Sequence, residues 1–89
     1  MANPVALFHF RLDASHGIGR TELLKLWSAA CGSNEVAVSR VESGDGHRRT
    51  HTYSLLGPAR SVNIDDAEIR MHDSLSTALP KATFVLRRY

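Results

Sequence analysis

The sequence predicts an α+β domain whose elements follow in the order β-α-β-β-α-β. Apolar residues alternate near the amino terminus, recur at helical spacing in two later segments, and return in three further β-prone runs. A hydrophobic fraction of 43% and a charged fraction of 22% are typical of a folded globular chain, and 89 residues suffice for one domain. We therefore expect residues 1–89 to form a single domain.

The first element is a strand over residues 5–12, because its apolar side chains alternate. Alternation sorts the side chains into two faces: Ala6, Phe8, Phe10 and Leu12 on one, and Val5, Leu7, His9 and Arg11 on the other. The first set suits a buried face, and the second set suits an outer face that carries polar groups.

A first helix is predicted over residues 21–31, where apolar residues recur three and four positions apart. Thr21 is the expected N-cap residue, and Glu22 suits the positive end of the helix dipole. Gly32 stands where a left-handed glycine commonly ends a helix.

A β-hairpin is predicted from residues 35–42 and 47–56. Asp45 and Gly46 tolerate the positive φ angles of a tight turn between two β-prone runs. Gly57 and Pro58 end the second strand, since proline cannot donate to a strand ladder. This second strand is unusually polar, which indicates that cationic and hydrogen-bonding side chains project from the sheet.

A second helix is predicted over residues 64–79, with Asn63 as its cap and Pro80 beyond its end. Residues 82–89 are β-prone and predict a last strand that reaches the carboxyl terminus. This order favours one antiparallel sheet with both helices on a single face, which is the ferredoxin-like arrangement. The alternative is an intertwined dimer in which the first strand forms a ribbon with its copy.

Composition limits the possible functions. No apolar run approaches the roughly 20 residues that span a bilayer, and the amino terminus lacks a signal-peptide pattern, so we expect a cytoplasmic protein with no membrane association. No paired carboxylates or activated nucleophile stand out, and Cys31 lies near the end of an apolar helix face, where a buried, inert thiol is common. We expect no enzymatic activity, no catalytic residues and no cofactor.

Metal binding is not expected either. His47 and His51 have zinc-like spacing for a helix, but on a strand they would lie roughly 13 Å apart, too far to share one ion. Residues 14–21 join a strand to a helix as a phosphate loop does, yet Ala14 replaces the first glycine of that motif and Arg20 replaces its lysine. A looser phosphate contact by Arg20 and the Thr21 amide is consistent with the sequence.

Eleven Lys and Arg against nine Asp and Glu give a net charge of +2, and several arginines fall in predicted strands. Such a sheet surface could neutralise phosphates while its aromatic rings stack on bases, although a solvated polar face would look the same. The residues predicted to bind nucleic acid are Arg11, Arg20, Arg48, Arg49, His51, Tyr53, Arg87 and Arg88. The leading hypothesis is a non-enzymatic nucleic-acid-binding protein that forms a homodimer and serves as a transcriptional regulator.

The competing hypothesis is a protein-protein interaction module or assembly subunit with no role in nucleic-acid binding. Ile69 lies opposite the apolar face of the second predicted helix, and Val5 and Leu7 share the outer face of the first predicted strand. Exposed apolar side chains can form a self-association surface or a surface for a protein partner. Val5, Leu7 and Ile69 are therefore the predicted interface residues.

Overall fold

The computed structural model describes residues 4–13, 16–44, 49–58, 60 and 63–89. The elements are β1 (Val5–Asp13), α1 (Arg20–Cys31), β2 (Ala37–Ser43), β3 (Thr50–Gly57), α2 (Ile64–Ala78) and β4 (Arg87–Arg88). The predicted β-α-β-β-α-β order is confirmed. No helix among these described residues is long and apolar enough to cross a membrane.

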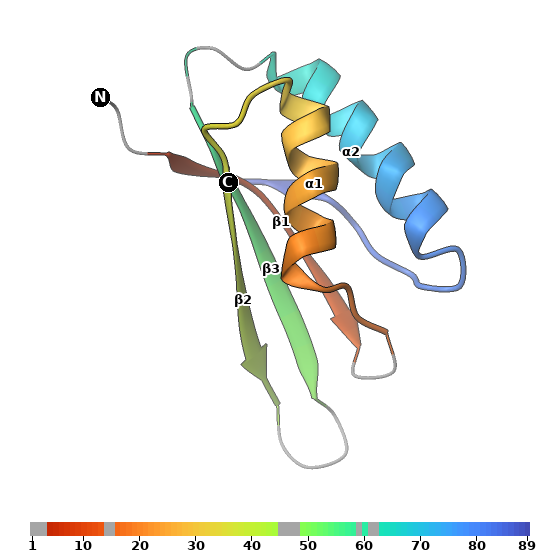
Figure 1. Cartoon of the computed structure of the whole chain (residues 1–89). Coiled ribbons are helices and arrows are strands. Elements are labelled where there is room, and N and C mark those ends of the chain that lie inside the picture. The colour runs from red at the N-terminus through yellow and green to blue at the C-terminus, as the bar shows by residue number, and fades with distance from the viewer. Residues whose placement is uncertain (1–3, 14–15, 45–48, 59, 61–62) are drawn as a thin grey trace.

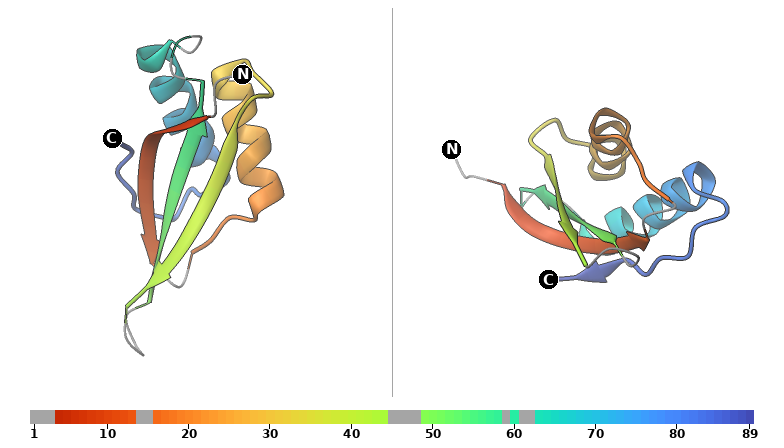
Figure 2. Two further views of the ribbon diagram at one scale, coloured as in Figure 1. Left: turned by 90° about the vertical axis from the view of Figure 1, so that its left-hand side faces the viewer. Right: turned by 90° about the horizontal axis from the view of Figure 1, so that it is seen from below.

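The four strands form one antiparallel sheet in the order β2-β3-β1-β4. Both helices lie on the same side of this sheet, while the other face has no helix over it (Figure 1, and the view from below in Figure 2). The hairpin strands β2 and β3 extend past the amino-terminal end of α1 (Figure 1). The sheet therefore has a packed inner face, an open outer face, and an inner segment beyond α1 that no helix covers.

The core lies between the inner face and the two helices. Phe8, Phe10 and Leu12 are buried from β1, as the alternation predicts, and they meet buried side chains of α1 and α2. The ring of Trp27 packs edge-on against Phe8, with ring centroids 5.7 Å apart, and its Nε1 donates a hydrogen bond of 2.8 Å to the Leu56 carbonyl. Trp27 therefore ties α1 to both central strands.

The helix ends agree with the sequence in part. The Asn63 side chain accepts a hydrogen bond from the Asp66 amide at 3.1 Å, and Gly32 adopts the left-handed conformation with φ 66°. The Thr21 prediction is wrong, because α1 begins one residue earlier and Gly19 is its N-cap residue. Glycine has no side chain to accept a hydrogen bond, so the first amides of α1 have no side-chain cap.

A β-bulge changes the alternation at the start of β1. Ala6 pairs with Leu56 and Phe8 pairs with Leu55, so Leu7 is the extra residue. Leu7 is half-buried against the core, and its Cδ1 lies 3.4 Å from the position that a Cβ on Gly57 would occupy. The predicted place of Leu7 on the outer face is therefore wrong.

The last strand is much shorter than the sequence predicts. Residues 82–86 alternate between half-buried side chains, which include Phe84 and Leu86, and exposed ones, yet they form no ladder. Only Arg87 and Arg88 pair with β1, and the Tyr89 amide adds a hydrogen bond of 3.1 Å to the Leu7 carbonyl. The segment after α2 thus packs through its side chains before its backbone reaches β1.

Candidate nucleic-acid interface

The strand register assigns each side chain of the sheet to one of its two faces, because directly opposed residues share a face. On the inner face, Arg40 lies opposite Tyr53, and Tyr53 opposite Phe10. On the outer face, one row of opposed residues crosses all four strands: Ser39, Ser54, His9 and Arg87. The adjacent outer row contains Val41, Thr52 and Arg11.

The outer rows bring together a set of side chains that we name the outer patch: His9, Arg11, Ser54, Arg87 and Tyr89. The His9 and Tyr89 rings contact each other with centroids 4.6 Å apart, and the Tyr89 hydroxyl is 2.7 Å from the Ser54 hydroxyl. These contacts orient Tyr89 while 67% of the residue stays exposed. The outer patch therefore presents a positioned, accessible aromatic ring.

Of the two arginines of the outer patch, Arg87 lies opposite His9 on β4, and Arg11 lies two residues after His9 on β1. Neither forms an ion pair with a carboxylate of the described residues, whereas other arginines on the surface do. Both line a groove of about 460 Å³ between β1 and the carboxyl-terminal segment, together with hydroxyls of Thr52 and Thr83. Among the described strand residues, Asp13 at the end of β1 is the carboxylate on the outer face, and its Oδ1 lies 2.9 Å from the Nδ1 of His16. The groove thus has positive charge and hydrogen-bond donors.

Tyr53 does not belong to the interface predicted for it. It is only 2% exposed, lies on the inner face, and stacks on Phe10 with centroids 5.0 Å apart and ring planes 12° from parallel. Its ring therefore cannot stack on a base. The polar sequence of β3 is compatible with either face, and pairing with the buried Phe10 decides the question.

His51 and Arg49 also differ from the prediction. His51 lies opposite Leu12 on the inner face, and its Nδ1 is buried with no hydrogen-bond partner among the described residues. Arg49 precedes β3 and forms an exposed, long ion pair of 3.8 Å with Glu42. Neither residue joins the outer patch. Arg48 and His47 lie outside the described residues.

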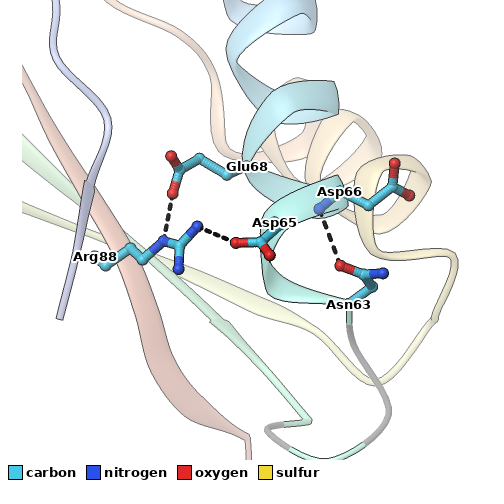
Figure 3. A network of polar contacts seen from close by, with 5 residues as sticks. All are labelled: Asn63, Asp65, Asp66, Glu68 and Arg88. Carbon is cyan, nitrogen blue, oxygen red and sulfur yellow. Dashed lines mark hydrogen bonds and ion pairs between the residues drawn. The ribbon is translucent and has the colours of Figure 1, made fainter.

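Arg88 points to the helices, on the face opposite to Arg87. Its guanidinium contacts the Asp65 carboxylate at 2.6 Å and the Glu68 carboxylate at 2.5 Å, next to the Asn63 cap at the start of α2 (Figure 3). The hydrogen bond to Glu68, and then the one to Asp65, raise the pKa of Arg88. Arg88 therefore joins β4 to α2 on the helix side of the sheet and does not belong to the outer patch.

Arg20, the remaining predicted residue, is also on the helix side. It lines a separate cleft at the start of α1 with Arg40, a residue that sequence reasoning missed. The alternation of β2 could have identified it, because Arg40 has the same parity as the buried Val38 and therefore projects from the inner face. That part of β2 extends past the amino-terminal end of α1 (Figure 1). Two distinct groups of arginines thus lie on opposite faces of the sheet.

Three further candidates from the sequence are the Cys31 thiol, a metal site, and the exposed interface residues Val5 and Ile69. Partial burial raises the pKa of the Cys31 thiol to about 11, so the thiol is protonated and unreactive near neutral pH. The described residues contain no group of three or more His, Cys, Asp or Glu side chains that could hold a metal ion. Of the predicted interface residues, Val5 and Ile69 are exposed, at 46% and 63%.

No protein-family model matches the chain, and a search of curated proteins finds no significant similarity. The two arginine groups and the exposed Tyr89 ring are therefore the features from which a function can be inferred.

Proposed function

We propose that the protein binds single-stranded nucleic acid through the outer patch, without catalysis. The observation that carries the proposal is the exposed Tyr89 ring, which His9 and Ser54 orient on the same outer face as Arg11 and Arg87, two arginines without a carboxylate partner among the described residues. An aromatic ring on an open sheet face can stack on a base whatever its identity. Arginines on the same face as that ring can contact phosphates of the same strand.

The arrangement favours a single strand over a duplex. Bases in a duplex are stacked on each other, so a lone ring on a sheet reaches them only where the strand is open. The hydroxyls of Thr52 and Thr83 in the neighbouring groove can donate to backbone oxygens. Two arginines and one ring predict modest affinity with little sequence preference. A regulatory role would therefore need a second copy of the chain or a partner protein.

The fold supports this proposal. The sheet order β2-β3-β1-β4, with both helices on one face, favours the ferredoxin-like arrangement predicted from the sequence. In such a sheet the two central strands, here β1 and β3, present their outer side chains on a wide open surface. A homodimer would double the patch, and β2 has an outer edge with no neighbouring strand among the described residues, where a second chain can pair.

The test is fluorescence anisotropy with labelled single-stranded DNA and RNA at several salt concentrations. The Arg11→Ala/Arg87→Ala double variant is expected to lose at least about tenfold in affinity, and its log K against log salt slope should fall by about 1.4, or 0.7 per lost phosphate contact. Tyr89→Ala should weaken binding about fivefold or more while the salt slope is unchanged, because stacking is not electrostatic.

The matched control is Arg70→Ala/Lys81→Ala, which removes two exposed positive charges that belong to α2 and the turn after it and not to the outer patch. Equal losses in the two double variants would mean that overall charge and not the outer patch governs binding. Absence of binding to every single strand at low salt would refute the proposal. It would also favour the second candidate, a protein-interaction role, for which the 63% exposed Ile69 on α2 is the specific observation.

A further inference from the structure

The cleft at the start of α1 lies on the inner side of the sheet, away from the outer patch. Its volume is about 310 Å³, which is at the lower end of the range for small-molecule sites. Its polar side chains come from three elements: Arg20 at the start of α1, Arg40 on β2 and Tyr53 on β3. Ile18, Leu23 and Val38 supply an apolar wall.

The charge in this cleft is not balanced by the protein. No Asp or Glu lines it, and neither Arg20 nor Arg40 has an ion-pair partner among the described residues. Arg20 is the first residue of α1, where the positive end of the helix dipole makes a cation unfavourable. Both Arg20 and Arg40 are exposed, so their guanidinium groups are accessible to an anion that enters the cleft.

The buried hydroxyl of Tyr53 provides a second observation. The residue is 2% exposed and lines the cleft, and its oxygen accepts only a long hydrogen bond of 3.4 Å from the Ile18 amide. No described group accepts the hydroxyl proton of Tyr53. A buried donor without an acceptor is costly unless a ligand completes it.

Amides at the start of α1 lie beside these groups. The first helical hydrogen bond runs from the Leu23 amide to the Gly19 carbonyl, so the amides of residues 20–22 precede it and have no helical acceptor. Gly19 offers no side chain to cap them. Two guanidinium groups, a hydroxyl donor and free amides together match the oxygens of a phosphate dianion.

We propose that this cleft binds the phosphate of a phosphomonoester, with the organic part of the ligand against Ile18, Leu23 and Val38. The cleft is larger than inorganic phosphate requires, and its apolar wall gives an attached body a surface to contact. The phosphomonoester can be a free nucleotide or the 5′-phosphate end of a nucleic-acid strand. The site lies on the opposite face from the outer patch and does not depend on the function proposed for that patch.

Calorimetric titration of the full chain tests the proposal with three probes: inorganic phosphate, adenosine 5′-monophosphate, and one oligonucleotide with and without a 5′-phosphate. Adenosine monophosphate is expected to bind more tightly than phosphate. It should shift the NMR amide signals of Gly19 and Thr21. A preference for the phosphorylated oligonucleotide would assign the site to strand ends, and equal binding of both oligonucleotides would assign it to a free nucleotide.

Three variants check the assignment. Arg20→Ala/Arg40→Ala should reduce adenosine monophosphate affinity at least about tenfold, and Tyr53→Phe should reduce it about threefold, because it removes the donor and keeps the ring stacked on Phe10. Arg11→Ala/Arg87→Ala removes the same charge from the other face and should leave this affinity unchanged.

The matched pair separates this site from the outer patch. If neither phosphate nor adenosine monophosphate binds, or if Arg20→Ala/Arg40→Ala binds as well as the unmodified chain, the proposal is overturned. Single-strand binding through the outer patch could still hold in that case, since it depends on Arg11 and Arg87. Circular dichroism spectra of each variant establish that lost binding is not lost folding.

Discussion

The two faces of the sheet use similar residue types for different purposes. The inner face buries large side chains such as Phe8, Phe10 and Tyr53 under two helices, and the cation Arg88 on this side is paired with carboxylates of α2. The outer face has no helix over it, and its side chains are mostly hydroxyls and exposed rings with Arg11 and Arg87 among them. Chemical type alone therefore does not indicate role, whereas the face on which a residue lies does.

The largest expected difference between the faces is in stability. Trp27→Ala removes a fully buried ring that packs on Phe8 and hydrogen-bonds to the Leu56 carbonyl, so it should lower the free energy of unfolding by about 3–5 kcal/mol. Val41→Ala, at a residue 61% exposed on the outer face, should change it by less than about 0.5 kcal/mol. Urea denaturation followed by circular dichroism measures both, because Trp27 is the only tryptophan and its fluorescence is lost with it.

Comparable losses in the two variants would contradict the assignment of the faces. If Trp27→Ala does not fold at all, Leu23→Ala provides a smaller cavity on the same helix, with an expected loss of about 2–5 kcal/mol.

A smaller effect, of opposite sign, is expected at His51. Its buried Nδ1 has no partner among the described residues, and such a group costs about 1–3 kcal/mol in lost hydration. His51→Leu places an apolar side chain beside Leu12, so the free energy of unfolding should rise by about 1 kcal/mol. Urea denaturation checks this, and His72→Leu on the exposed side of α2 is the control. A decrease in stability would mean that Nδ1 has a partner and that His51 is structural.

The sequence predicts most of the helices and strands and their order, but it predicts poorly which face of the sheet each side chain lies on. Alternation identifies the buried side chains of β1, and the Asn63 cap and Gly32 mark ends of the two helices, because these signals are local. The bulge at Leu7 is not local, since it depends on how β1 pairs with β3. It also ends the simple alternation on which the outer face was predicted.

The candidate site shows the same limit. Alternation predicts that Arg11 and Arg87 lie on the outer face. In β3, polar residues occupy positions of both parities, so alternation does not show which of them face outward. Arg88 was misassigned because its partners, Asp65 and Glu68, are 23 and 20 residues away along the chain. Only the packing of α2 beside β4 brings them together. Arg40 was missed because its role depends on where α1 begins relative to β2.

Arg87 and Arg88 give the most local test of the two faces, and the smallest expected effect. Arg88 joins the two-residue β4 to α2, so Arg88→Gln should loosen the carboxyl terminus and speed hydrogen exchange of the Tyr89 amide about threefold to tenfold. Global stability should change little, since exposed ion pairs contribute little to it. Arg87→Gln should leave this exchange rate unchanged and weaken only single-strand binding, because Arg87 has no partner in the described part of the chain.

If both substitutions speed exchange equally, β4 depends on charge and not on the contact with α2. If Arg88→Gln alone does so and also weakens nucleic-acid binding, then Tyr89 must be held in place from the inner face for the outer patch to function.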